Sequence, residues 1–424
     1  MSREGSCPPH SITPAMDRHN GSIFFIAYAL IFLAAPVIYV GVVQAALCDK
    51  LGASATIANL PSAAFFGGNF APVFLTAFIT HRHERSVIVW ASTTSAALLA
   101  IVCLSLLVPL PDFVRVGALI LQGLVQGFCS STSQVFMFQC MGRGATVEGR
   151  AKAFKLAYGF GPIAAVIGSL GAQFILNKGI PTVRYPHDFA LLYFLAIPCM
   201  VGVALVCRRF ELISLPEVAQ SHSFHTALMS GFRAFVQVRS LLYLWVAYAL
   251  WYSTLSAIPN LSLYAKQALG REPKELSGWI LALRFGFKCL AGYLLGVMTL
   301  RYGIRLPLIV TVGLLGGAIL WAWTVPGHAY LLSFGLMGAG ELGGAYFPNY
   351  LVAVSPVETG ARNQALLTLA TPVAGVAATL HGALTDHYGF SASFGFGLST
   401  ALLALCLLWR LPTIQVKRVR GVPS

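Results

Sequence analysis

The sequence predicts an all-α polytopic membrane protein with twelve transmembrane helices arranged as two six-helix bundles. Of its 424 residues, 57% are hydrophobic and only 10% are charged, whereas soluble domains carry roughly 25% charged residues. So few charges cannot cover a water-facing surface. The apolar residues also gather in segments long enough to cross a bilayer, and features of the first half of the chain recur in the second half.

The apolar segments set the expected domain boundaries. A helix needs about 20 apolar residues to cross the hydrocarbon core. By that measure the first half contains spans at 23–47, 58–80, 86–109, 114–140, 151–176 and 188–207. The second half contains spans at 238–264, 277–300, 305–325, 328–354, 364–386 and 390–411. We therefore expect a tail at 1–22, a bundle at 23–207, a linker at 208–237, a bundle at 238–411 and a basic tail at 412–424.

The distribution of cations predicts the orientation in the membrane. The first apolar run is too long for a cleaved signal peptide, and an even number of spans places both termini on one side. The segments expected on that side hold 19 of the 28 Lys and Arg residues, and the opposite segments hold 7. Because cytoplasmic loops carry an excess of Lys and Arg, the positive-inside rule then places both termini in the cytoplasm. We expect the protein in the cell (inner) membrane. Because the cations are spread over short loops, the net charge of +14 does not indicate nucleic-acid binding.

The linker carries a helical pattern. Phe224, Leu228, Phe232 and Phe235 recur at helical spacing beside Arg233. This pattern predicts a short amphipathic helix on the membrane surface, with an unstructured loop as the alternative.

Several apparent cofactor motifs are discounted. The nine cysteines form no CxxC pair, so neither a disulfide framework nor a zinc site is expected. Gly338-Ala-Gly340-Glu-Leu-Gly343 matches GxGxxG but lies within an apolar span rather than after a strand. Gly123 with Gly127, and Gly340 with Gly344, are better explained as close helix contacts. No Walker loop is present, so we expect no cofactor, no metal and no use of ATP.

The loops after equivalent spans of the two halves are similar. Those after the second and eighth spans are Thr80-His-Arg82-His-Glu-Arg85 and Leu300-Arg301-Tyr-Gly303-Ile-Arg305. Those before the fifth and eleventh are Glu148-Gly149-Arg150 and Glu358-Thr-Gly360-Ala-Arg362. A parallel repeat of six spans is typical of transporters built from two bundles.

Over nearly its whole length the sequence resembles the major facilitator superfamily of transporters. That family carries the motif G-x-x-x-D-R-x-G-R-[KR] after spans 2 and 8. The second copy keeps its glycines and cations as Gly296, Arg301, Gly303 and Arg305, and has Leu300 where Asp is usual. The first copy keeps the cations as Arg82 and Arg85, and has Ala77, His81 and Glu84 at the Gly, Asp and Gly positions.

The resemblance implies that these loops help to lock one conformation, with arginines bonded to helix C-termini and to an acid. The expected members of these conformational gate loops are Arg82, Arg85, Gly296, Arg301, Gly303, Arg305, Glu148, Arg150, Glu358 and Arg362. Because both Asp positions have changed, the resemblance does not extend to the acidic part of this lock.

Three ionisable residues lie deep inside expected spans. Arg284 and Lys288 are four residues apart in the eighth span and so share one helix face. Glu341 lies in the middle of the tenth span, whereas the other acids lie in loops, tails or span ends. A charge at that depth costs about 2.5–3.5 kcal/mol, so each residue needs a partner, water or a role. A mixed cluster between the two spans, facing a wet cavity, satisfies all three.

This cluster has a functional and a structural interpretation. In the resembling family, spans 1, 4, 7 and 10 line the central cavity, and spans 2, 5, 8 and 11 flank it. Functionally, Arg284 or Lys288 would bind an anionic substrate group, while Glu341 carries a proton or orients a cation. Structurally, the three would form a buried ion pair without substrate contact. Two cations against one acid favour an anionic or zwitterionic ligand.

Other polar or aromatic residues inside the spans are weaker candidates for substrate binding, namely Asn69, Gln122, Gln126, Tyr39, Tyr248, Trp251 and Tyr252. Such residues suit a small organic solute. Amides also bond between helices, and aromatic rings pack or anchor at interfaces, so a structural role is the alternative for each. For His381 we expect hydrogen-bonded packing rather than proton transfer.

The favoured function is secondary transport of a small organic solute by alternating access, with a proton as candidate co-substrate and the bilayer as the other partner. We expect a monomer and no enzymatic activity. Multidrug efflux is the first alternative; Leu119 stands where drug/proton antiporters often carry an arginine, which counts against it. A non-transporting sensor or lipid-handling protein on the same fold is the alternative from another class.

Overall fold

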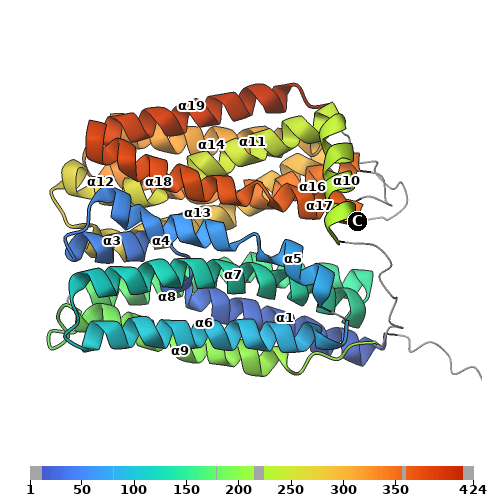
Figure 1. The fold of residues 1–424 in the computed structure, drawn as a ribbon, viewed down its shortest axis with the longest axis horizontal. Coiled ribbons are helices and arrows are strands. Elements are labelled where there is room, and N and C mark those ends of the chain that lie inside the picture. The colour runs from blue at the N-terminus through green and yellow to red at the C-terminus, as the bar shows by residue number, and fades with distance from the viewer. Residues whose placement is uncertain (1–11, 80, 178, 214–223, 356–359, 414–424) are drawn as a thin grey trace, which may run out of the picture.

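The computed structural model describes residues 12–79, 81–177, 179–213, 224–355 and 360–413. Within these residues every regular element is a helix, and the long helices run side by side along one direction (Figure 1). The chain enters at α1 and leaves after α19 at the same end of the bundle. We call this the tail end and its opposite the far end.

The first half of the chain forms nine helices and one 3-10 turn, which are α1 (Pro14–Leu33), α2 (Ala35–Ile38), α3 (Val42–Lys50), α4 (Ala55–Gly68), α5 (Ala71–Phe78), η1 (His81–His83), α6 (Glu84–Leu107), α7 (Asp112–Gly144), α8 (Val147–Leu176) and α9 (His187–Cys207). The first of these begins at Pro14, capped by the Thr13 side chain. The helix therefore starts before the apolar part of the first expected span, within the expected tail at 1–22.

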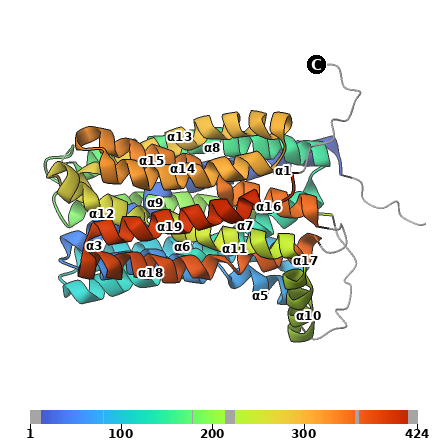
Figure 2. The ribbon, with the colours of Figure 1, turned by 90° about the horizontal axis from the view of Figure 1, so that it is seen from above.

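The second half forms α10 (Phe224–Gln237), α11 (Arg239–Leu255), α12 (Ile258–Leu269), α13 (Pro273–Tyr302), α14 (Arg305–Thr324), η2 (Gly327–Leu331), α15 (Leu332–Gly340), α16 (Gly343–Val354), α17 (Gly360–Thr368), α18 (Thr371–Tyr388) and α19 (Phe390–Trp409). The expected linker helix is confirmed as α10, which crosses the tail end at a steep angle to the long helices (Figures 1 and 2).

Five expected spans, at 23–47, 58–80, 238–264, 328–354 and 364–386, are broken into shorter helices. Four breaks have a proline in the first turn of the following helix, at Pro36, Pro72, Pro259 and Pro372. Proline suits a first turn because its missing N–H would be unbonded there. The break in 328–354 has no such proline and falls instead within the glycine-rich stretch around Glu341.

Nine helices of the described residues are long and apolar enough to cross a membrane. The prediction of an all-α, multi-pass membrane protein is therefore confirmed. The expected spans at 23–47, 58–80 and 328–354 are not among these nine, because their breaks leave no sufficiently long continuous apolar helix. The total of twelve spans, and the domain boundaries drawn from it, stay predictions.

The helices of each half lie together and meet along two seams. In Figure 1, α1–α9 occupy the lower part and α11–α19 the upper part. The seams are formed by α4 packed on α18 and by α8 packed on α13. Inside the first half, Gly123 and Gly127 let α7 approach α4 closely, since a Cβ at either position would meet a backbone carbonyl at 2.1 Å or less. The expected close contact at this glycine pair is confirmed.

Candidate functional site

The three ionisable residues inside the spans form one cluster. Arg284 and Lys288 lie one turn apart on α13, and Glu341 directly follows α15. The Nε of Arg284 donates to one carboxylate oxygen of Glu341, and the Nζ of Lys288 donates to the other over 3.1 Å. Arg284 is 7% exposed and Glu341 8% exposed. With all three groups ionised, the cluster carries one net positive charge.

Aromatic rings connect this cluster to the first half of the chain. Phe285 follows Arg284 on α13, and its ring lies 5.9 Å from Lys288 Nζ. The same ring meets Tyr39 edge-on at 5.5 Å and Phe32 at 6.2 Å. Of the three charged side chains, Lys288 is the most accessible, with 19% of its side chain exposed. The cluster therefore lies beside both halves and contacts open space mainly through Lys288.

A break in the tenth span places Glu341. The N–H of Gly344 donates to the carbonyl of Glu341 over 3.0 Å, where a continuous α-helix would direct it to the carbonyl of Gly340. The indole N–H of Trp251, on α11, donates to the Gly340 carbonyl over 3.1 Å. Trp251 is 1% exposed, so its indole N–H donates to the protein backbone and does not face open space.

Trp251 belongs to a stack of rings on α11. Tyr248 stacks on it at 5.5 Å with nearly parallel planes, and the Tyr248 hydroxyl donates to the Tyr252 hydroxyl over 3.2 Å. Tyr252 is half-buried and meets Phe66 of the first half edge-on at 5.7 Å. Tyr252 is thus the member of this stack that reaches the boundary between the halves.

A second break, between α2 and α3, places Tyr39. The side-chain amides of Gln44 and Gln122 both donate to the Val37 carbonyl over 2.8 Å. The Gln122 carbonyl accepts from the Tyr193 hydroxyl over 2.9 Å. Both ends of the Gln122 amide are thus bonded within the first half, which shows how it supports the break. Its expected contact with substrate stays a prediction.

The remaining amide candidates have different surroundings. Asn69 caps the C-terminus of α4 and is half-buried. The Gln126 amide nitrogen donates to Ser130 Oγ over 2.8 Å, while its buried carbonyl oxygen has no hydrogen-bond partner among the described residues. His381 is fully buried with Nδ1 2.7 Å from Ser393 Oγ and Nε2 3.1 Å from the Ser253 carbonyl, as expected of a packing histidine.

Equivalent loop arginines at the tail end make equivalent contacts. Arg85 donates to the Phe210 carbonyl over 3.0 Å, just after α9. Arg305 donates to the carbonyls of Leu408, over 3.2 Å, and Trp409, at the end of α19. Each arginine therefore bonds backbone carbonyls at the end of the last long helix of its own half.

Other members of the expected gate loops vary in environment. Gly303 ends α13 with a φ of +86°, a conformation that favours glycine. Glu148 pairs with Lys152 on the exposed face of α8. Arg82 and Arg301 are exposed and Arg150 is half-buried, and Gly296 faces open space. Glu358 and the side chain of Arg362 lie outside what the structure describes. The gating role of these loops stays a prediction.

At the far end, polar contacts join the two halves. Asp386, near the end of α18, accepts from the N–H groups of Ala55 and Thr56 over 2.9 and 2.8 Å, and from the Thr56 hydroxyl over 2.5 Å. Its carboxylate thus caps the N-terminus of α4 across the seam. This contact was not predicted from the sequence, although Gly382, Asp386 and Gly389 carry the spacing of the glycines and the aspartate in the G-x-x-x-D-R-x-G motif.

Ion pairs also join the two halves at the far end. They link the first half to the second as Lys50 with Glu272, Asp188 with Lys274, and Asp49 with Lys266. Hydrogen bonding from Lys50 lowers the pKa of the Glu272 carboxyl below its usual range. At the other seam, the Gln173 side chain accepts from the N–H groups of Gly278 and Trp279 over 3.0 and 3.1 Å.

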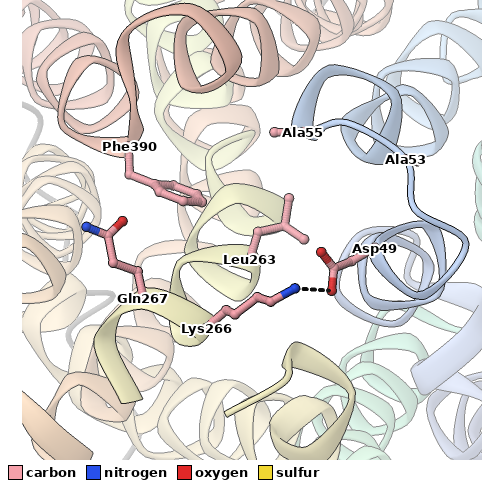
Figure 3. Close-up of a pocket in the computed structure, with 7 residues that line it drawn as sticks. All are labelled: Asp49, Ala53, Ala55, Leu263, Lys266, Gln267 and Phe390. Carbon is pink, nitrogen blue, oxygen red and sulfur yellow. Dashed lines mark ion pairs between the residues drawn. The ribbon is translucent and has the colours of Figure 1, made fainter. Parts of the chain in front are cut away.

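A cavity of about 300 Å³ lies on the boundary at the far end. Its walls come from both halves, and Asp49 and Lys266 face each other across it at 3.7 Å, with Leu263 and Phe390 as apolar walls (Figure 3). Ala55, whose N–H donates to Asp386, also lines it. The cavity therefore belongs to the closed arrangement of the far end and is separate from the ion cluster.

Comparison with known proteins shows similarity in fold. No protein-family model and no curated protein sequence matches the chain. Among solved structures, it is similar to the peptide transporter POT in complex with sulfate, with a TM-score of 0.68 and 12% identity over 95% of this chain and 96% of that one. A mutant form of the nucleoside transporter NupG gives 0.67 and 12% over 93% and 98%. A D-xylose-proton symporter gives 0.65 and 12% over 94% and 97%.

These similarities extend over nearly the full length of both chains in each comparison. The chain therefore has the fold of the major facilitator superfamily transporters, as the motif resemblance predicted. The three solved structures are transporters of different solutes by their names, so the fold by itself does not define a substrate.

Proposed function

We propose that this protein is a secondary transporter that moves a small anionic or zwitterionic solute across the membrane by alternating access. The observation that carries the proposal is the buried cluster of Arg284, Lys288 and Glu341, with its surplus positive charge beside both halves. Unbalanced charge is costly inside a membrane protein and commonly marks a substrate or ion pathway. Binding a monoanion neutralises the cluster.

The geometry suggests the order of contacts. A substrate carboxylate or phosphate reaches Lys288 first, because that side chain is the most exposed of the three. Glu341 already occupies the Nε donor of Arg284, so a substrate anion that takes this donor displaces the carboxylate. Adding a proton to Glu341 weakens both of its ion pairs and makes both cations available. Proton uptake and anion binding then support each other, which is the basis of proton-coupled transport through this site.

The asymmetry between the two ends supports alternating access. The far end is closed by contacts between the halves, including the Asp386 cap and the ion pair of Asp188 with Lys274. At the tail end, Arg85 and Arg305 bond within their own halves. We therefore propose that the structure represents a state closed at the far end, and that the bundles 23–207 and 238–411 rock about the cluster to open it.

The orientation completes the proposal. With both termini in the cytoplasm and the protein in the inner membrane as a monomer, the closed far end faces outward. Substrate bound in this state exchanges with the cytoplasm. The gradients of substrate and coupled ion decide whether net transport is import or export.

A thermal-shift screen of the purified protein tests the anionic substrate class. The compounds are carboxylates, phosphates, neutral sugars, amino acids and cationic drugs. A ligand stabilises the folded state by RT ln(1 + [L]/Kd), so a compound at 100 times its Kd adds about 2.7 kcal/mol. We expect an anionic or zwitterionic hit that is lost in Arg284→Ala and weakened in Lys288→Met. Lys152→Met is the matched control, because Lys152 pairs with Glu148 on an exposed face.

A further inference from the structure

We infer that Trp251 is a positioning residue, whose indole N–H stabilises the break in the tenth span and thereby holds Glu341 against Arg284 and Lys288. Trp251 itself makes no substrate contact in this inference, which replaces the role that the sequence suggested for it. This inference deepens the proposed function. It rests on that function only for the role of the cluster in binding the substrate anion.

The backbone of the break needs an outside donor. At the end of α15 the Gly344 N–H donates to Glu341 rather than to Gly340. Gly340 is buried, and a buried carbonyl without a hydrogen bond is costly. Trp251 Nε1 supplies that bond over 3.1 Å. Glu341 is the next residue in the chain, so the bond holds the backbone directly before the carboxylate.

The packing leaves the indole little freedom. A Cβ at Gly343 would lie 2.6 Å from Trp251 Nε1, so glycine is needed for the indole to reach the carbonyl. Tyr248 covers the ring at 5.5 Å and Phe347 lies at 5.8 Å. With 1% exposure, the ring offers no face to a solute.

The break also lies directly beside the cations. A Cβ at Gly338 would overlap the carbonyl of Arg284, so α15 touches the backbone of α13 at the residue that Glu341 must reach. A small displacement at Gly340 therefore changes the contact between carboxylate and guanidinium. Since Lys288 Nζ is bonded to the same carboxylate at 3.1 Å, its reactivity reports where Glu341 lies.

Acylation of Lys288 by acetic anhydride in the folded protein in detergent, followed by digestion and peptide mass spectrometry, measures this position without any substrate. An amine that is bonded to a carboxylate reacts slowly, and Glu341→Gln sets the rate for the released amine. We expect Trp251→Phe, which keeps a ring but lacks the N–H, to acylate Lys288 roughly two- to tenfold faster than wild type, the range for loss of one ordinary hydrogen bond. Tyr248→Phe is the matched control, because its hydroxyl bonds only Tyr252 among the described contacts.

A wild-type rate in Trp251→Phe, with Glu341→Gln clearly faster, would overturn the inference. If Trp251→Phe does not fold, Gly343→Ala moves the indole from the opposite side. Faster acylation of Lys288 in that variant would support the inference, and a wild-type rate would overturn it. Lys266, 62% of whose side chain is exposed, gives the internal reference rate. The outcome is independent of the ligand screen, so a failed screen with faster acylation would remove the proposed substrate class and keep the positioning role.

Discussion

Replacing Asp386 with Asn is expected to open the far end of the protein. The carboxylate accepts three hydrogen bonds from the first turn of α4 in the other half and places a negative charge at a helix N-terminus. Asparagine keeps one carbonyl acceptor at this position but loses the charge and the second oxygen. The remaining closure, including Lys50 with Glu272 and Asp188 with Lys274, is untouched.

The magnitude follows from the strength of such caps. Loss of a capping side chain costs about 0.5–2 kcal/mol, and a charge at a helix N-terminus contributes about 0.3–1 kcal/mol when exposed. Asp386 is exposed, so solvent screening keeps the total near the lower half of that sum. A loss of about 1–2 kcal/mol shifts the equilibrium between closed and open far ends by a factor of roughly 5–30.

Spin labels on Ala53 and Gln267 provide the assay. These residues belong to opposite halves and line the far-end cavity (Figure 3), so the distance between the labels grows when that end opens. We expect a larger long-distance population in Asp386→Asn than in the parent. Asp112→Asn is the control, since Asp112 pairs with Arg115 inside the first half. Equal distance distributions in the parent and Asp386→Asn, or an equal change in the control, would refute the capping argument.

Three further predictions concern the cluster, the first helix break and pH. Glu341→Gln leaves two cations unpaired and is expected to destabilise the protein by about 3–5 kcal/mol; Lys288→Met, which leaves one balanced pair, costs less, and denaturation in mixed micelles ranks the two. Gln122→Leu removes one of two donors to the Val37 carbonyl and takes the Gln122 acceptor from the buried Tyr193 hydroxyl, so we expect a loss of about 1–3 kcal/mol in the same assay. Thr93→Val is the control, since the Thr93 hydroxyl donates to the Val89 carbonyl on an exposed helix face. Lys50 lowers the pKa of the Glu272 carboxyl. The Glu272 carboxylate therefore stabilises the closed far end above the ordinary Glu pKa of about 4.3, and this stabilisation is lost as the pH falls through the lowered pKa of the folded protein. We expect the Ala53–Gln267 label pair to show this opening at low pH in the parent, and to show a smaller change in Glu272→Gln.

The sequence contained enough to predict the fold class and the ion cluster. Long apolar segments require helices in a bilayer, and a charge such as Glu341 cannot remain there without a partner, so Arg284 and Lys288 were the natural candidates. The structure confirms that these three residues meet. The helical pattern of the linker was likewise sufficient to predict α10, because an amphipathic period is a local property of the sequence.

The helix breaks and their supports could not be predicted in the same way. The bonds from Trp251 to Gly340 and from Gln122 to Val37 join residues more than 80 positions apart, and only the packing of the helices brings them together. A buried tryptophan and a buried amide look identical in sequence to residues that face a solute. The Asp386 cap was hidden for a related reason, since an acid at a span end is ordinary until its partner on α4 is known.

Solute flux through the reconstituted protein tests the proposed transport of an anionic or zwitterionic solute most directly. Liposomes carrying the protein would be loaded with the anionic or zwitterionic compound identified by thermal shift, and uptake of its radiolabelled form by exchange would be measured. We expect uptake that exceeds that of protein-free liposomes and falls by about tenfold, equivalent to about 1.4 kcal/mol, in Lys288→Met and Arg284→Met but not in Lys152→Met. Uptake restricted to neutral or cationic compounds, at rates unchanged in both cluster variants, would contradict the proposal.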